Sequence, residues 1–166
     1  MIQPDKLKEL ISYDPLTGVL TWKPRASSRF NTQYAGTPAL ANPSKGYRTG
    51  RLLGKNVKAH RAAWAIHYGE WPIGMIDHIN GDRSDNRISN LRVVNASENG
   101  KNQRPRRTNK TGQMCINWFP RDKKWWVKIT ANGRQKHVGY FDTFEDAVAA
   151  RDRAYAENGF HENHGR

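Results

Sequence analysis

A run of nine residues without an apolar side chain divides the sequence and limits the folds open to it. This segment, RPRRTNKTG, spans residues 104–112. A segment of this composition cannot contribute to a core and is typical of a basic linker. The 166-residue sequence therefore predicts two small domains, at residues 1–103 and 113–166, joined by a linker at 104–112.

The charge is large and unevenly distributed. The chain carries 28 Lys and Arg against 15 Asp and Glu, a formal net charge of +13. Residues 101–140 hold eleven basic residues and one acid, so they contribute 11 − 1 = 10 of this surplus. Such a surplus predicts a polyanionic partner, and we expect double-stranded DNA. No membrane association is expected, because the sequence has no long apolar run and no strongly amphipathic basic helix.

The cysteine content and the first residues of the chain bear on its compartment. One cysteine, Cys115, excludes an internal disulfide and a cysteine-based zinc site. The N-terminal residues MIQPDKLKEL lack an apolar signal segment. We therefore expect a cytoplasmic protein.

The hydrophobic pattern predicts an α+β fold of short elements in the N-terminal half. Helices are expected at residues 4–12 and 59–68, the second ended by Gly69. Residues 24–45, rich in Pro, Ser, Asn and Gly, are expected to form a surface loop. Strands are expected at residues 19–22, within 47–59 on both sides of a turn at 54–56, at 75–78 and at 91–94.

The stretch IDHINGDRSDNRISNLR, residues 76–92, places a carboxylate and an imidazole side by side at the end of a predicted strand. Cleavage of a DNA strand needs a base for water and a divalent metal for the phosphate. The neutral imidazole of His78 suits the base, and the carboxylate of Asp77 suits Mg²⁺. Asn95 and Glu98 have the spacing of a helix-capping box, which places Asn99 on a short helix after the second strand. The amides of Asn86 and Asn90 are placed to tie the loop together and to hold the imidazole in one tautomer.

The longer segment DHINGDRSDNRISNLRVVNASENGKN resembles the HNH (ββα-metal) nuclease motif of phage homing endonucleases. DPLTGVLTWK and AHRAAWAIHYGEWP extend this resemblance upstream. The resemblance implies an N-terminal HNH unit with a small β/α elaboration, cutting DNA in the host cytoplasm. It implies His78 as the general base, Asn90 as the residue that orients the loop, and Asp77 and Asn99 as ligands of one Mg²⁺ or Mn²⁺.

The C-terminal half predicts a three-stranded antiparallel sheet packed on one helix. Asn132-Gly133 between two alternating strands is a strong hairpin signal, and a two-residue loop pairs Ile129 with Lys136 and Val127 with Val138. A helix is expected from Thr143 to about residue 156. One sheet face then faces this helix, and the other carries Trp126, Lys128, Thr130, Gln135 and His137, with Arg134 at its end.

The segments KKWWVKI and GRQKHVGYFDTFEDAVAARDRAY resemble the ethylene-response-factor (AP-two) DNA-binding domain. The resemblance implies that a basic sheet docks on duplex DNA. We expect phosphate contacts from the linker and further contacts from the sheet and the first domain. The full set of expected DNA-binding residues is Arg104, Arg106, Arg107, Lys110, Arg121, Lys123, Lys124, Trp126, Lys128, Arg134, Lys136, His60, Arg61 and Arg87.

These patterns together predict a DNA endonuclease that nicks one strand near a recognised site. One HNH site has one nucleophile position, so a monomer is expected to nick; a dimer is the alternative and would cut both strands. The runner-up function is a non-catalytic DNA-binding or regulatory protein. RNA binding is less favoured, because the sheet lacks the closely spaced Phe/Tyr pattern of an RNA-recognition motif.

Overall fold

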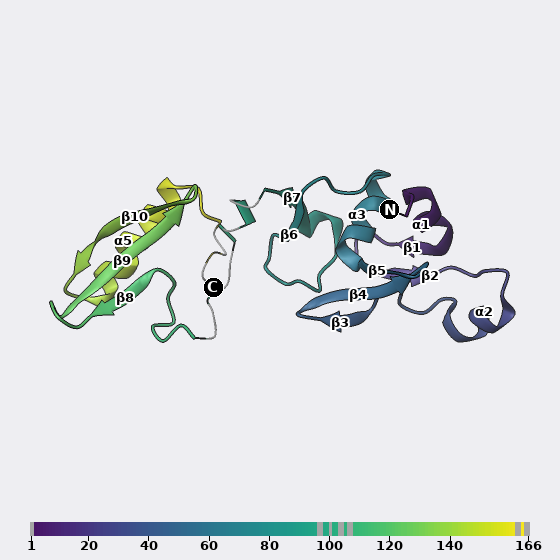
Figure 1. The fold of residues 1–166 in the computed structure, drawn as a ribbon, viewed down its shortest axis with the longest axis horizontal. Helices are drawn as coiled ribbons and strands as arrows, with labels where there is room; N and C mark the ends of the chain where they lie inside the picture. The colour runs from purple at the N-terminus through teal and green to yellow at the C-terminus, as the bar shows by residue number, and fades with distance from the viewer. Residues whose placement is uncertain are drawn as a thin grey trace. The chain divides into compact units, whose positions relative to one another are not determined.

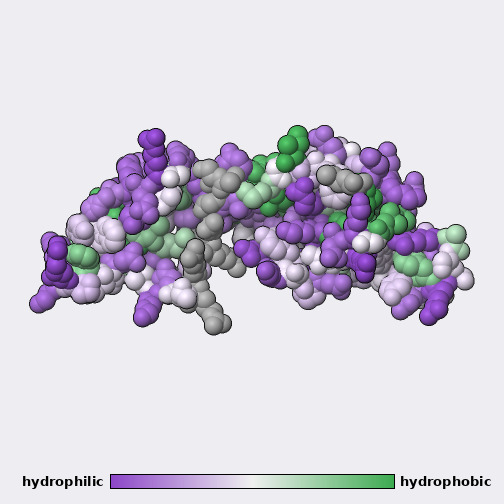
Figure 2. Space-filling view, in the orientation of Figure 1, coloured by the Kyte–Doolittle hydropathy of each residue, from purple (hydrophilic) through white to green (hydrophobic). Residues whose placement is uncertain are grey.

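The computed structural model describes residues 2–95, 98–99, 101–102, 105, 108–161 and 164. It divides into two compact units, Met1–Val94 and Asn95–Arg166 (Figure 1). The boundary falls ahead of the segment 104–112 that the sequence predicts as the linker. Hydrophilic residues cover much of the visible surface of both units (Figure 2). Within the described residues, no helix is long and apolar enough to cross a membrane.

The first unit begins with a helix and a hairpin. Helix α1 (Pro4–Leu10) has proline in its first turn, where the missing N–H is not needed. Strand β1 (Ile11–Tyr13) pairs antiparallel with β2 (Leu20–Trp22). Leu7, Ile11 and Leu20 are buried in the core of this unit.

The expectation of a loop over residues 24–45 is wrong. This region contains helix α2 (Ser28–Tyr34) and strand β3 (Asn42–Ser44). The Ser27 hydroxyl caps α2 by accepting from the amide of Phe30. No α2 residue is buried, so the helix has no apolar stripe that hydrophobic periodicity would detect.

Strands β3, β4 (Tyr47–Leu52) and β5 (Lys55–Lys58) form a three-stranded antiparallel sheet. Leu52 pairs with Lys55, so the turn is formed by Leu53 and Gly54 and lies slightly ahead of the predicted 54–56. Both turn residues have positive φ, 48° and 77°, which matches the primed turns of two-residue hairpins.

Helix α3 (Ala59–Tyr68) crosses the core of the first unit and ends at Gly69 in the left-handed conformation, as predicted. Ala59, Ala62, Ala63 and Ala65 are buried and let neighbouring elements approach closely. Strands β6 (Met75–His78) and β7 (Leu91–Val94) form an antiparallel pair with the predicted bounds. Their Ile76 and Leu91 belong to the same core as α1 and α3, so residues 1–74 pack around this pair as expected.

The second unit contains a three-stranded antiparallel sheet in the order β10-β9-β8. The strands are β8 (Ile116–Phe119), β9 (Lys124–Ala131) and β10 (Arg134–Phe141). Helix α5 (Phe144–Glu157) lies along one face of this sheet (Figure 1). Helix α5 begins after Thr143, where the sequence predicts a helix start; Thr143 caps it, and the small side chains of Ala147, Ala150 and Ala154 are buried. The predicted fold of one sheet on one helix is confirmed.

The predicted register of the second hairpin holds only near its turn. Ile129 pairs with Lys136, but Val127 pairs with Gly139 and not with Val138. A β-bulge between His137 and Gly139 shifts the pairing by one residue. This shift places Tyr140 opposite Trp126, so the sheet face turned away from α5 gains an aromatic ring.

Candidate active site and DNA-binding face

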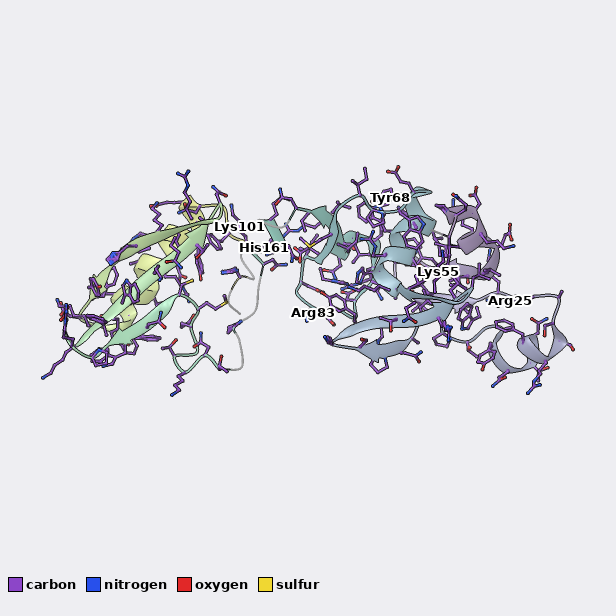
Figure 3. All side chains as sticks on the ribbon, in the orientation of Figure 1. Arg25, Lys55, Tyr68, Arg83, Lys101 and His161 are labelled. Atoms are coloured by element: carbon purple, nitrogen blue, oxygen red, sulfur yellow. The ribbon has the colours of Figure 1, made fainter. Side chains whose placement is uncertain are left out.

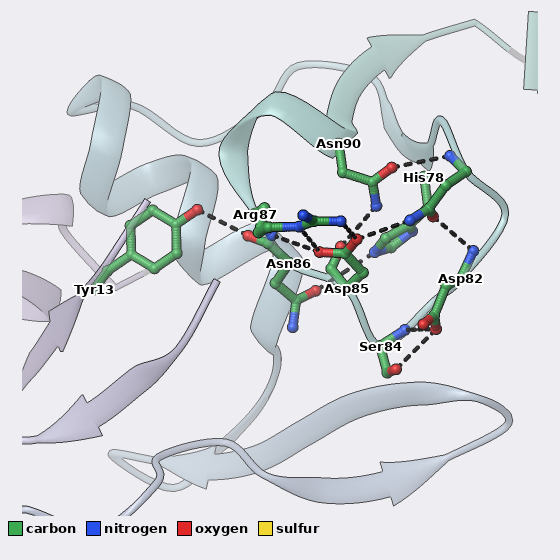
Figure 4. Close-up of polar contacts among 9 residues, drawn as sticks. Tyr13, His78, Asp82, Ser84, Asp85, Asn86, Arg87 and Asn90 are labelled. Atoms are coloured by element: carbon green, nitrogen blue, oxygen red, sulfur yellow. Dashed lines mark hydrogen bonds and ion pairs between the residues drawn. The ribbon is translucent and has the colours of Figure 1, made fainter. Parts of the chain in front are cut away.

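The loop from Asn80 to Asn90 is held together by its own side chains (Figure 4). The buried Asn90 accepts from the Asn80 amide at 2.9 Å through Oδ1 and donates to the Asp85 carbonyl at 2.8 Å through Nδ2. Arg87 donates to both oxygens of Asp85, at 2.9 and 2.6 Å. This bond to Arg87 lowers the pKa of Asp85 to about 2. Asn90 and Asp85 thus give the polar loop a defined shape.

His78 lies at the end of β6 and is 3% exposed. Its Nε2 lies 3.4 Å from Oδ1 of Asn86. If Nε2–H donates to that oxygen, the lone pair lies on Nδ1, where it can accept a proton. Burial lowers the pKa of His78 below its usual value, while the hydrogen bond to Asn86 Oδ1 opposes this shift. The environment therefore favours a neutral imidazole at pH 7.

Asn86 is itself fixed from the first hairpin of the chain. The Tyr13 hydroxyl donates to the Asn86 carbonyl at 2.8 Å (Figure 4). Burial of the phenol raises the pKa of Tyr13 to about 12, so this donor keeps its proton. Gly18 packs against the backbone of Asn86 and Arg87, where an added Cβ would lie 2.5 Å from the Arg87 nitrogen. The DPLTGVLTWK segment therefore supports the loop that carries Asn86.

Asp77 is buried at 7% exposure and pairs with Arg92, the residue opposite it on β7. Nε and Nη2 of Arg92 donate to Oδ2 of Asp77 at 3.0 and 2.8 Å. Arg92 is absent from the sequence-based set of functional residues. The signal that could have found it is the predicted pairing of the two strands, which places opposite charges across from each other.

His60 and Arg61 do not lie as predicted for DNA-binding residues. His60 is 3% exposed, and burial lowers its pKa to about 3, so it is neither accessible nor charged. The Arg61 guanidinium donates to the carbonyls of Gly74 and Pro72 at 3.0 and 2.9 Å, which ties α3 to the segment before β6. His60 is therefore removed from the DNA-binding set, and Arg61 has a structural role.

Asn99 belongs to the second unit, in the helical turn capped by Asn95. The predicted capping box is confirmed: Asn95 Oδ1 accepts from the Glu98 amide at 2.9 Å, and Glu98 Oε2 accepts from the Asn95 amide at 2.8 Å. The same turn is fastened to the C-terminal tail, since Lys101 Nζ donates to the Asn158 carbonyl at 2.8 Å.

The predicted metal ligands have the oxygen donor atoms that a hard divalent ion prefers. Asp77 offers a carboxylate and Asn99 an amide oxygen, which are donors that Mg²⁺ and Mn²⁺ accept. The described residues contain no group of three or more His, Cys, Asp or Glu that could hold a metal by themselves. An ion at Asp77 would share a carboxylate that already has a cationic partner in Arg92.

The sheet face of the second unit turned away from α5 carries aromatic and basic side chains. Lys128 Nζ lies 4.6 Å from the centroid of the Trp126 ring, and Trp126 stacks on Tyr140 at 6.3 Å. Arg121 lies 5.3 Å from the Phe119 ring. We call this surface, formed by Phe119, Lys124, Trp126, Lys128, His137 and Tyr140, the outer face.

The other predicted DNA-binding residues fall in four groups. Lys110, Arg121 and Lys123 are exposed. Arg134 and Lys136 are exposed too, but they pair with Ala131 and Ile129 and so occupy positions of the face turned toward α5. Arg87 is bonded to Asp85, and Lys124 pairs with Asp142 at 2.9 Å. Arg104, Arg106 and Arg107 lie outside the described residues.

Comparison with known proteins assigns the class of the central segment. Residues 57–101 match the HNH endonuclease family, so the chain contains a domain of this nuclease class. The domain lies in the middle of the chain and not at its N-terminus. The sequence is also 29% identical over 92 residues to Protein 3.8 of Escherichia phage T7, which covers 55% of this chain and 76% of that protein. No solved structure matches the chain. The resemblance of residues 113–166 to the ethylene-response-factor domain stays a prediction.

Proposed function

We propose that this protein is a metal-dependent DNA endonuclease of the homing type that nicks one strand near a recognised site. The observation that carries the proposal is the environment of His78. Its imidazole is buried, bonded to Asn86 and adjacent to the buried carboxylate of Asp77, within a segment that matches the HNH endonuclease family. A neutral base next to a carboxylate that can bind a metal ion is an arrangement suited to metal-assisted hydrolysis of a phosphodiester.

In the proposed reaction, Nδ1 of His78 takes a proton from a water molecule. The water oxygen bonds to the phosphorus of the scissile phosphate, the bond from phosphorus to O3′ breaks, and O3′ takes a proton from solvent. Asn86 holds the imidazole in the reactive tautomer, and Asn90 holds the loop that carries Asn86. Asp77 and Asn99 would hold one Mg²⁺ or Mn²⁺, whose charge neutralises the phosphate.

The second unit is proposed to anchor the protein on double-stranded DNA through the outer face. Lys128 supplies positive charge there, Lys124 would exchange its partner Asp142 for a phosphate, and Trp126 and Tyr140 supply planar contact area. A β-sheet of this size fits the major groove, which admits a two-stranded ribbon. The basic segment 104–112 is proposed to follow the phosphate backbone. With one site per chain, a monomer nicks.

The experiment is incubation of supercoiled plasmid with the full chain in Mg²⁺ or Mn²⁺. We expect open circles that are absent with EDTA and with His78→Ala. His67→Ala is the matched control, because His67 lies exposed on α3 and is expected to leave nicking unchanged. Nicking that survives His78→Ala would contradict the role of His78, and linear product would indicate paired sites.

A non-catalytic DNA-binding protein is the second candidate. The observation that favours it is the ion pair of Asp77 with Arg92, which neutralises the carboxylate without a metal. If DNA that contains the recognised site stays intact but shows a salt-sensitive gel shift with the protein, this candidate is supported over the nuclease.

A further inference from the structure

The hairpin of β3 and β4 lies beside the nuclease loop, although it precedes the family-matched segment 57–101. Its turn consists of Lys45 and Gly46, between the paired residues Ser44 and Tyr47. Both turn residues have positive φ, 50° and 85°, as a type I′ turn requires. The turn is tight, and Arg83 from the β6–β7 loop reaches it by donating to the Lys45 carbonyl at 3.3 Å.

Tyr47, the first residue after this turn, packs against both histidines of the site. Its ring centroid lies 5.8 Å from that of His78 and 5.1 Å from that of His60. The two imidazoles are 5.2 Å apart in an edge-to-face arrangement. Tyr47 is only partly buried, so this ring extends from the buried imidazoles toward the surface.

Two cations lie over the Tyr47 ring. Lys58 Nζ is 5.1 Å and Arg83 Cζ is 5.0 Å from its centroid. Both side chains are exposed, and among the described residues neither forms an ion pair with a carboxylate. Figure 3 shows Arg83 near the end of the hairpin. The ring and the Lys45 carbonyl therefore hold two positive charges in place, neither of which forms an ion pair within the part of the chain that the structure describes.

The surrounding strands add to this positive charge. Residues 42–58 contain five basic residues and no acid. In the loop opposite, Asp85 is neutralised by Arg87, and Oδ1 of Asp82 accepts from the Ser84 amide and hydroxyl at 2.9 and 2.8 Å. A surface with this positive balance attracts the phosphates of DNA, because these groups carry the charge of DNA.

We propose that Lys58 and Arg83, held by Tyr47, form a phosphate-binding site beside His78 that seats a backbone phosphodiester of the strand to be cut. The inference rests on the proposed nuclease function for its position and deepens it by naming the substrate contact. A fixed guanidinium and an ammonium next to the base restrict the reacting phosphate to one register. The β3–β4 hairpin is then part of the active site, although it lies outside the family-matched segment.

The first test measures binding of uncut duplex DNA by full-length His78→Ala protein over a range of salt concentrations. Lys58→Gln and Arg83→Gln, each added to this background, should reduce the slope of log affinity against log salt by about one, the value for one lost phosphate contact. Lys55→Gln is the matched control, because Lys55 lies exposed on the same sheet and has no contact with Tyr47 among the described residues. Slopes equal to that of the control would overturn the proposal.

The second test locates the contact. The nick is mapped with active protein, and duplexes are made with a single neutral methylphosphonate at successive positions. Affinity is again measured with the His78→Ala protein, which should bind less tightly when the neutral position lies next to the nick site, and the added Arg83→Gln substitution should cause no further loss there. If the loss of affinity from the methylphosphonate and the loss from Arg83→Gln add independently at every phosphate next to the nick, the proposal is contradicted. Because the salt test uses uncut DNA, failure to nick plasmid refutes the nuclease function without deciding the phosphate contact.

Discussion

The guanidinium of Arg92 donates to Oδ2 of Asp77 through Nε and Nη2, at 3.0 and 2.8 Å, across the antiparallel pair of β6 and β7. The Asp77 side chain is 8% exposed and that of Arg92 is 36% exposed. A buried carboxylate needs a partner, because desolvation of an unpaired charge is costly. Arg92 therefore stabilises the fold around the proposed metal ligand and, at the same time, would compete with a metal ion for this carboxylate.

Substitution of Arg92 by Gln should destabilise the protein and make its stability depend on divalent ions. We expect a loss of about 1–2 kcal/mol, below the value for a fully buried pair because Arg92 is partly exposed. Addition of Mg²⁺ should restore part of this loss, since the ion replaces the missing cation at Asp77. Urea unfolding with and without Mg²⁺ measures both effects. Arg51→Gln, an exposed residue of β4, is the control. Equal Mg²⁺ effects on both variants would argue against an ion at Asp77.

Asn86→Asp should move the pH dependence of cleavage. The substitution places a carboxylate where the amide oxygen now lies 3.4 Å from His78 Nε2. A negative charge there favours the imidazolium and raises the pKa of His78, so the neutral base is reached only at higher pH. Rates of plasmid nicking across pH should show the acid limb displaced upward. Asn56→Asp adds the same charge on β5 and is expected to leave the limb in place. An unmoved limb in Asn86→Asp would exclude His78 as the group that titrates.

The buried imidazole of His60 should make the first unit sensitive to acid. Burial lowers the pKa of His60 from 6.5 to about 3, so the folded state binds fewer protons than the unfolded state between these values. Stability then falls as pH is lowered through 6.5, by up to about 1.4 kcal/mol for each pH unit, until the folded pKa is reached. Among the described residues, His60 Nδ1 is buried and has no hydrogen-bond partner, so replacement by an apolar residue breaks no hydrogen bond at this atom.

His60→Leu tests this expectation by urea unfolding at several pH values. The free energy of unfolding of the variant should decline less steeply below pH 6.5 than that of the wild type. Titrating groups distant from His60, such as His164, cancel in the difference between the two proteins, whereas the neighbouring imidazole of His78 contributes to it together with His60. His67→Leu removes an exposed imidazole and should behave as the wild type. Parallel curves for His60→Leu and the wild type would show that His60 carries no such linkage.

Asn90→Ala should release the loop between β6 and β7. The substitution removes one acceptor and one donor that are both used inside the loop. At about 1 kcal/mol for each lost bond, the free energy of unfolding should fall by about 2 kcal/mol, and nicking should fall with it because Asn86 loses its support. Asn56→Ala, an exposed amide on β5, is the comparison for unfolding. A loss no larger than that of Asn56→Ala would mean that water replaces these bonds.

Lys128→Gln tests the outer face of the second unit. Lys128 lies over Trp126 on the sheet face turned away from α5, so its loss should weaken binding of duplex DNA and lower the salt slope by about one. Arg153→Gln on α5 removes an equally positive but oppositely placed exposed charge and should leave the slope unchanged. The two variants are compared by titration of labelled duplex at several salt concentrations. The reverse result would place the DNA on the helix side of the unit.

The sequence predicted an element correctly wherever residues close together in the chain determine its structure. The bounds of β6 and β7, the end of α3 at Gly69 and the capping box at Asn95 follow from residues adjacent in the chain. Helix α2 gave no such signal, because none of its residues is buried. The pairing of Val127 with Gly139 was not predicted either. A bulge depends on contacts between two strands and does not change the alternation of apolar and polar residues along either strand.

The sequence by itself determined the residues proposed to react and their order: a carboxylate and an imidazole at the end of a strand, two amides in the loop that follows, and an amide in the capped turn beyond. Tertiary structure alone decided the chemical state of these residues and their neighbours. Burial keeps His78 and His60 neutral, Arg92 neutralises Asp77, and Tyr47 brings Lys58 and Arg83 to the site from segments distant in the sequence. The physical reason is that the pKa of a group and the partner of a charge depend on what surrounds it in space, which residue spacing along a chain does not specify.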